Sequence, residues 1–292
     1  MRLGSLDLQL VSDGGFKLDG GAMFGVVPRV LWEREVPADE SHRIPMATNC
    51  LLVRSGDELV LVDTGLGDKH DRKFRDHFAF EEGAARLPES LRAAGHALED
   101  VDHVVLTHLH FDHCGWNTVV RDGELVPAFP RARYWLDRGE VAHARDPNER
   151  DRASYLPENW EPLFAAGVVE LFDEAAEPVA GVRVVKAPGH NADMCVVLLD
   201  GGAGDRGVFL ADLVPTTAHV PYPWVMAYDL FPLQTIESKK RWLPRAAAER
   251  WLCIFEHDRR TPLARLREKR PGRFVAEALA AGDGAGGPGS GA

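Results

Sequence analysis

The fold is decided by one short stretch, Leu106-Thr107-His108-Leu109-His110-Phe111-Asp112-His113, in which three imidazoles and one carboxylate fall within six consecutive positions. It continues the apolar run Asp102-His103-Val104-Val105, which predicts a buried strand with the histidines on the loop beyond its end. His108 and His110 are two residues apart, so an extended backbone directs both rings to one side. A turn after Phe111 would aim Asp112 and His113 at a neighbouring point. The stretch predicts a metal-binding loop for one ion or two.

Three more predicted strands end in side chains of the same kind. The run 182–186 leads to Pro188-Gly189-His190, the run 208–210 leads to Asp212, and the run 251–256 leads to His257. Any one of these could be an ordinary polar residue or turn former. A carboxylate such as Asp212 can bridge two cations, because each of its oxygens can bind one. Four strand ends that carry such groups together predict a site for two metal ions.

This ordered set resembles the metallo-β-lactamase fold superfamily of metallohydrolases. The resemblance covers positions 49 to 258 and rests on the histidine-rich motif, His190, Asp212, His257 and the turn Val62-Asp63-Thr64-Gly65. It implies an α/β fold, the four-layer αβ/βα sandwich. It also implies the ligands: His108, His110 and His190 for the first metal, Asp112, His113 and His257 for the second, and Asp212 as the bridge. His110 at the second position of the motif favours hydrolytic over redox members.

A dinuclear centre of this kind predicts hydrolysis by a metal-bridging hydroxide, because coordination lowers the pKa of water from about 15.7 toward neutrality. Asp112 is the candidate catalytic residue, both ligand and proton shuttle. Imidazole and carboxylate ligands suit Zn²⁺, and also iron, cobalt or manganese. Asp63 and Thr107 are expected to steady the ligand loop without binding metal. The alternative for Asp63 is a plain turn cap.

Length and charge favour a single enzyme domain. The chain has 292 residues, and ligands spread from 108 to 257 must converge. We predict one domain over 1–281, a lid insertion at about 145–167, and a disordered Gly-rich tail over 282–292. The net charge of −11 argues against nucleic-acid partners. A basic cluster is interpreted as a solvated helix face; it comprises Arg259, Arg260, Arg265, Arg267, Lys269, Arg270 and Arg273.

The spacing of the cysteines and the length of the apolar runs indicate the cellular compartment of the protein. Cys50, Cys114, Cys195 and Cys253 lack paired spacing, which predicts reduced, buried thiols. Cys114 follows His113 and could approach the metals, although the resemblance gives it no role. The sequence shows neither an apolar run near 18 residues nor a charged start followed by an apolar segment. We therefore predict a cytoplasmic protein without a membrane partner.

Periodicity predicts alternating strands and helices. Strands are expected at 6–13, 49–53, 59–63 and 132–136 and within 168–211, with the second and third joined as a hairpin. Helices are expected at 87–94, 138–144 and 235–251. Pro244 should kink or break the last of these.

Aromatic segments between the ligands are candidates for the substrate pocket. The candidate residues are Phe111, Tyr155, Trp160, His219, Tyr222, Trp224, Met226 and Tyr228. They would form an apolar pocket for an acyl or aryl group. The alternative is that they cover the core or form the contact of a homodimer. The stretch from Gly20 to Pro28 is expected at the pocket mouth or at such a contact.

Within the superfamily, the sequence looks most like quorum-quenching lactonases and methyl-parathion-hydrolase-like enzymes. The leading expectation is attack on a lactone or ester carbonyl, above all of an N-acyl homoserine lactone. Such lactonases usually place a Tyr soon after the bridging Asp, whereas here the run 213–217 has none, so Tyr222 or Tyr228 would have to substitute. The alternatives are an organophosphate triesterase or arylesterase, then a glyoxalase-II-like thioesterase. A non-enzymatic metal-binding protein or an iron oxygenase is disfavoured.

Overall fold

Two seven-stranded sheets form the centre of the computed structural model, which describes residues 1–84 and 86–279. The first sheet has the order β1-β2-β3-β4-β5-β8-β9, with bounds Arg2–Leu3, Leu6–Asp19, Arg43–Ser55, Glu58–Val62, His103–Val105, Arg133–Asp137 and Val169–Phe172. The second runs from β10 to β16 in chain order, with bounds Ala175–Val179, Val182–Lys186, Cys195–Asp200, Arg206–Phe209, Leu252–Ile254, Leu263–Arg270 and Arg273–Ala278. A separate pair, β6 (Thr118–Arg121) and β7 (Glu124–Pro127), forms a small hairpin.

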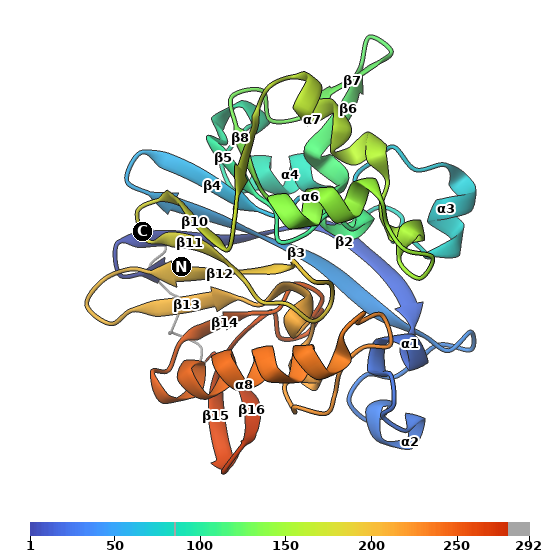
Figure 1. The fold of residues 1–292 in the computed structure, drawn as a ribbon, viewed down its shortest axis with the longest axis vertical. Helices are drawn as coiled ribbons and strands as arrows, with labels where there is room; N and C mark the ends of the chain where they lie inside the picture. The colour runs from blue at the N-terminus through green and yellow to red at the C-terminus, as the bar shows by residue number, and fades with distance from the viewer. Residues whose placement is uncertain (85, 280–292) are drawn as a thin grey trace, which may run out of the picture.

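The two sheets pack face to face, and helices cover their outer faces (Figure 1). Helices α3 (Arg72–His77), α4 (Leu87–Ala93), α6 (Arg138–Arg145) and α7 (Glu161–Ala165) lie on the side of the first sheet, and α8 (Pro232–Ala248) covers the second. The short helices α1 (Gly20–Phe24), α2 (Arg29–Trp32) and α5 (Phe111–Cys114) complete the set. These layers confirm the predicted four-layer αβ/βα sandwich.

Alternation along the strands explains why the first sheet has two buried faces. In β4, Val60 and Val62 pack toward the second sheet, whereas Leu59 and Leu61 pack toward the helices. Successive side chains of a strand point to opposite faces, so an unbroken apolar run requires partners on both sides. The second sheet satisfies the same condition with Trp242 and Leu243 of α8 on its outer side.

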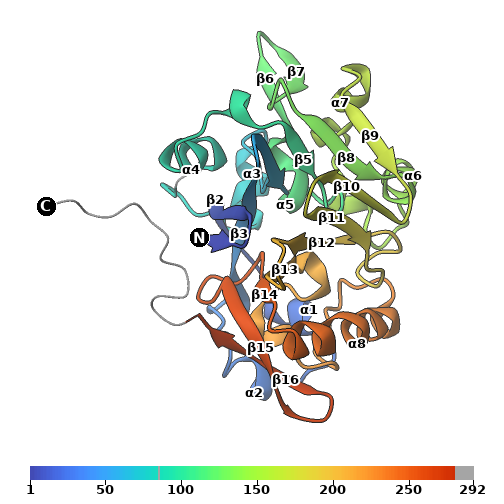
Figure 2. The ribbon, with the colours of Figure 1, turned by 90° about the vertical axis from the view of Figure 1, so that its left-hand side faces the viewer.

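Strand direction brings the loops of the site to one edge. β4, β5 and β8 are mutually parallel, so the loop after β5 leaves beside the end of β4. In the second sheet, β13 and β14 are parallel, and β11 runs the same way because β12 is antiparallel to both β11 and β13. The turned view in Figure 2 shows β10 to β14 stacked beside the first sheet. Residues that follow β5, β11, β13 and β14 can therefore meet.

Most element predictions are confirmed, and two are corrected. Helix α8 continues through Pro244 to Ala248, because Leu243 and Ala246 hold both sides of the proline against the core; the predicted break is absent. The basic cluster lies on β15, β16 and their flanking turns rather than on a helix. In β15, Ala264 and Leu266 are buried while Arg265 and Arg267 point outward, which is the period of a strand.

Several other predictions concern the limits of the chain and its compartment. The tail predicted over 282–292 lies outside the described residues, and the single domain over 1–281 stays a prediction. All four cysteines are free and buried, as expected. Across residues 1–84 and 86–279, no helix is both long and apolar enough to cross a bilayer.

Candidate metal centre

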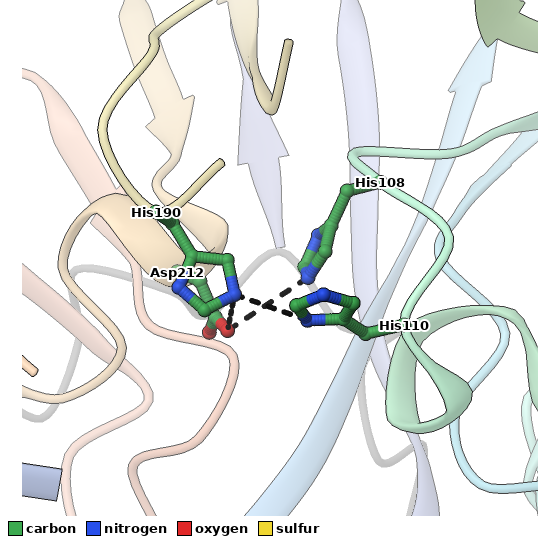
Figure 3. A group of neighbouring side chains, drawn as sticks. All are labelled: His108, His110, His190 and Asp212. Atoms are coloured by element: carbon green, nitrogen blue, oxygen red, sulfur yellow. Dashed lines mark hydrogen bonds and ion pairs between the residues drawn. The ribbon is translucent and has the colours of Figure 1, made fainter. Parts of the chain in front are cut away.

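Four loops bring the predicted ligands to one point between the sheets. His108 and His110 leave β5, Asp112 and His113 lie on α5, His190 follows β11, Asp212 sits on the turn Ala211–Leu213 after β13, and His257 follows β14. Figure 3 shows His108 and His110 approaching from one side and His190 and Asp212 from the other. All of these side chains are buried, the most exposed at 8%.

The first cluster consists of His108, His110, His190 and Asp212, whose ligand atoms all lie within 4.8 Å of one another. Nε2 of His190 lies 3.1 Å from Nδ1 of His110 and 3.2 Å from Oδ2 of Asp212. Nε2 of His108 lies 3.8 Å from the same Asp212 oxygen. Four donor atoms with these spacings could hold one cation.

The second cluster consists of Asp112, His113 and His257, again with ligand atoms within 4.8 Å of one another. The Nε2 atoms of His113 and His257 are 3.3 Å apart. Oδ2 of Asp112 lies 3.8 Å from the first of them and 3.7 Å from the second.

Asp212 lies between the two clusters. Its Oδ1 is 3.1 Å from Nε2 of His257, and its Oδ2 is 3.2 Å from Nε2 of His190. The nearest imidazole of each oxygen therefore belongs to a different cluster, and Oδ2 also lies 3.6 Å from Nε2 of His113. This is the arrangement that a carboxylate bridging two cations requires.

The donor set fits divalent metal ions on a structural test. Within the part of the chain that is described, Nε2 of His108 and Oδ1 of Asp212 are buried without a hydrogen-bond partner. A buried polar atom without a partner is costly, and such atoms occur where an ion or reactant is missing. Imidazole nitrogens only 3.1–3.3 Å apart also bring their lone pairs close together, which is unfavourable. A cation removes both problems.

The outward-facing ring nitrogens are held by specific partners. Nδ1 of His113 lies 3.0 Å from Oδ2 of Asp63, and that same oxygen accepts the Thr107 hydroxyl at 2.6 Å. Oγ1 of Thr107 is also 3.1 Å from Nδ1 of His108. Asp63 and Thr107 thus contact the ring nitrogens of His113 and His108. Such partners fix the ring orientation and tautomer of a ligating histidine.

Two supporting carboxylates were not anticipated from the sequence. Glu256 places Oε2 3.0 Å from Nδ1 of His113, and Asp229 places Oδ1 3.1 Å from Nδ1 of His190. The only sequence signal for Glu256 is its position directly before His257. No sequence pattern distinguishes Asp229, because it lies on an irregular segment before α8.

Electrostatics within the clusters are strong. Burial raises the pKa of the Glu256 carboxyl to about 8 despite the neighbouring His113. Burial would also raise the pKa of Asp212, but His190, His113 and His257 hold it well below its usual range. Burial opposes a charged His257, yet Asp212 raises the pKa of that imidazole to about 9. An anionic Asp212 surrounded by imidazoles is the charge state in which it can bind cations.

Local backbone geometry explains how His190 reaches this point. Gly189 has φ +148°, and a Cβ there would lie 2.5 Å from Cα of Thr235. Only glycine lets the loop pass so close to the start of α8.

Comparison with known sequences agrees with this geometry. Residues 43–268 match the sequence model of the family described as the metallo-beta-lactamase superfamily. The chain belongs to the metallo-β-lactamase superfamily.

Individual superfamily relatives are distant. A probable metallo-hydrolase of Mycobacterium tuberculosis is 30% identical over 215 residues, covering 62% of this chain and 63% of the relative. An N-acyl homoserine lactonase of Bacillus cereus is 27% identical over 151 residues, covering 49% of this chain and 54% of the relative. The chain thus spans less than two thirds of the length of these curated relatives. The crystal structure of a probable metal-dependent hydrolase from Staphylococcus aureus has a TM-score of 0.86 and 28% identity, covering 96% of this chain and 99% of that chain.

A cavity of about 390 Å³ opens onto the two ligand clusters. His110, Asp112, His190, Asp212 and His257 line it. The lining also includes the mostly apolar side chains of Leu18, Met23, Phe78, Phe111, Met226 and Tyr228, and the residues Arg150, Asp151, Ala153 and Ser154. The N-terminal stretch from Gly20 thus borders the cavity as expected, through Ala22 and Met23.

The candidate pocket residues divide into two groups. Phe111, Met226 and Tyr228 line the cavity, whereas Tyr155, Trp160, His219, Tyr222 and Trp224 do not. Trp160 and Tyr155 pack in the core between the first sheet and its helices. His219 stacks on Phe24, with ring centroids 4.5 Å apart. Tyr222 and Trp224 line a separate surface cavity of about 990 Å³.

The predicted lid and Cys114 have structural roles of their own. From 145–167, only Arg150, Asp151, Ala153 and Ser154 line the cavity, while Leu163 is fully buried with Trp160. Sγ of Cys114 donates to the Leu109 carbonyl at 3.4 Å. Cys114 belongs to neither cluster.

Proposed function

We propose that this chain is a dinuclear metal-dependent hydrolase of lactones or esters, with an N-acyl homoserine lactone as the leading substrate. The observation that carries the proposal is Asp212, which presents one oxygen to each of two clusters of buried histidines. The lactonase relative from Bacillus cereus and the probable metallo-hydrolase from Mycobacterium tuberculosis support the same reaction class.

The roles of the residues follow from their positions. His108, His110 and His190 would hold one ion, Asp112, His113 and His257 the other, and Asp212 both. When bound, two divalent ions supply a nucleophilic water near neutral pH and polarise the oxygen of the scissile carbonyl. Asp112 lines the cavity, so its carboxylate can hold a proton beside the leaving group. Asp63, Thr107, Glu256 and Asp229 keep the ligand rings in orientation.

The cavity favours a substrate with an apolar group. Phe111, Met226 and Phe78 line the cavity, and its volume suits a small or medium-sized ligand. An acyl chain could pack there while the carbonyl faces the centre. The same side chains would accept the aryl group of an arylester or organophosphate triester, which is the second candidate. A glutathione thioester is less favoured, because Arg150 is the one basic residue other than histidine among the cavity-lining residues described.

A substrate panel on metal-analysed protein tests the proposal. The panel contains acyl homoserine lactones of several chain lengths, aryl esters, a paraoxon-type triester and a glutathione thioester. We expect the highest kcat/KM for a lactone, and we expect Asp112→Asn and His190→Ala to abolish its turnover. Lactone turnover absent at every chain length would remove the leading substrate, and unchanged activity in either variant would remove the mechanism.

The native metal, the assembly and the compartment complete the proposal. We propose Zn²⁺ on the chemistry of the donors, with iron, cobalt and manganese as alternatives that elemental analysis distinguishes. A cytoplasmic homodimer that quenches lactone signals remains the working expectation. Val26 and Val30 are 87% and 68% exposed, which suits them to a dimer contact. Sedimentation of the wild type and of the double variant Val26→Ser/Val30→Ser tests this dimer contact. A monomeric wild type would contradict the dimer.

A further inference from the structure

Glu140 is a carboxylate that the candidate centre does not use, although it is only 2% exposed. It lies on α6 and points toward the ligand loops. Its Oε1 accepts the backbone N–H of Leu109 at 2.8 Å and the hydroxyl of Tyr155 at 3.1 Å. Its Oε2 accepts Nδ2 of Asn191 at 2.8 Å. A buried carboxylate is retained at a cost, and here donors surround both of its oxygens.

The partners of Glu140 adjoin histidines of the first cluster. Leu109 is the residue between His108 and His110, and Asn191 directly follows His190. Tyr155 pairs with the backbone of His110 in an isolated bridge, and their ring centroids are 4.8 Å apart. One side chain therefore connects two loops that come from different sheets.

Asn191 extends this connection into its own loop. Its Oδ1 accepts the backbone N–H of Asp193 at 2.9 Å, and its carbonyl accepts the N–H of Gly189 at 2.8 Å. The side chain of Asn191 is thus fixed in one orientation, with the amide group toward Glu140.

We propose that Glu140 is a positioning residue that holds His108 and His110 at the correct distance from His190, and so sets the affinity of the first cluster for its metal ion. This inference rests on the proposed dinuclear function. Glu140 has no contact with the second cluster, whose His113 is held instead by Asp63. Loss of Glu140 should therefore weaken one ion selectively.

The decisive experiment is a swap of hydrogen-bonding partners. In Glu140→Gln the new amide must face either Leu109 N–H or Asn191 Nδ2, so two donors oppose each other. In Asn191→Asp two carboxylates oppose each other. The double variant Glu140→Gln/Asn191→Asp restores a donor facing an acceptor, with the total charge unchanged. Zn²⁺ binding to metal-free protein is measured by competition with a chromophoric chelator, alongside circular dichroism to verify folding.

We expect each single variant to bind one of its two ions roughly 10–100-fold more weakly, with the other unchanged, and the double variant to recover most of the loss. Val141→Ala is the matched control, because it truncates a buried apolar side chain of the same helix that makes no hydrogen bond to the ligand loops. It should lower the unfolding temperature and leave both affinities intact. If Glu140→Gln fails to fold, Tyr155→Phe takes its place. This variant removes the hydroxyl that donates to Glu140 and accepts from Asn191 Nδ2 at 3.2 Å, and it should cause a smaller loss of affinity.

The outcomes separate the two proposals. Wild-type protein that binds no Zn²⁺ overturns the dinuclear function together with this inference. Wild-type protein that binds two ions, with single variants that bind both equally well, overturns the positioning role alone. Equal weakening of both ions, or no recovery in the double variant, also overturns it.

Discussion

The carboxylate of Asp229 lies 3.1 Å from Nδ1 of His190, which leaves Nε2 as the nitrogen that faces the two clusters. The other Asp229 oxygen accepts the Thr235 hydroxyl at 3.0 Å, so the loop after β11 is fixed to the first turn of α8. Asp229 is 1% exposed, and water cannot replace it. The orientation of His190 therefore depends on a residue 39 positions away in sequence.

We expect Asp229→Ala to reduce metal affinity roughly 10–100-fold, the range found when the outer partner of a ligating histidine is removed. Asp229→Asn should lose less, because its amide oxygen can still accept from Nδ1. Chelator competition on the two variants measures the difference. The exposed Asp205→Asn serves as a control for the change of charge. Equal affinities in Asp229→Ala and wild type would contradict a role for Asp229 in orienting His190.

Asp212→Ala should lower the metal content from two ions toward one or none. The variant loses a donor from both clusters at once, because Oδ1 and Oδ2 face different histidines. Elemental analysis after dialysis against limiting Zn²⁺ gives the stoichiometry. A variant that keeps two ions with wild-type affinity would show that Asp212 does not bridge.

The clusters could be predicted from the sequence because their ligand residues lie in short contiguous segments that follow apolar runs. His108 to His113 fall within one turn, and His190, Asp212 and His257 each follow an apolar run that can only be a buried strand. Parallel strand ends converge in such a sheet, so placing the strands also places the residues after them.

The supporting network and the pocket could not be predicted in the same way. Glu140 and Asp229 act across long sequence separations, and an acidic residue on an exposed-looking segment carries no pattern that distinguishes it. Trp160 and His219 were misplaced because an aromatic side chain packs equally well in a core or a pocket. The strand over 263–270 was missed because its outer half is charged on both faces and shows no apolar alternation.

Tyr228→Phe tests whether this hydroxyl assists the substrate carbonyl. Tyr228 lines the same cavity as Asp112, and it is 40% exposed to the cavity mouth. Because a donor aimed at developing charge acts mainly in the transition state, we expect kcat to fall about tenfold or more with KM little changed. Tyr222→Phe is the matched control, since Tyr222 lines the other cavity beside Phe274. Equal kcat in the two variants would exclude Tyr228 from this role.

His219 should make folding stability depend on pH. Burial lowers the pKa of its imidazole to about 3, and the neutral ring donates Nε2–H to the Met23 carbonyl at 2.8 Å. The folded-state pKa lies below the ordinary 6.5, so the unfolded chain binds the proton first as pH falls. The stability that the neutral His219 ring contributes is therefore present above pH 6.5 and is lost as pH falls toward 3, with about 1.4 kcal/mol gone by pH 5.5. Urea unfolding of wild type and His219→Gln at pH 7 and 5.5 isolates it, because the other histidines titrate alike in both proteins. Identical pH dependence in the two would show that His219 is not buried in its neutral form.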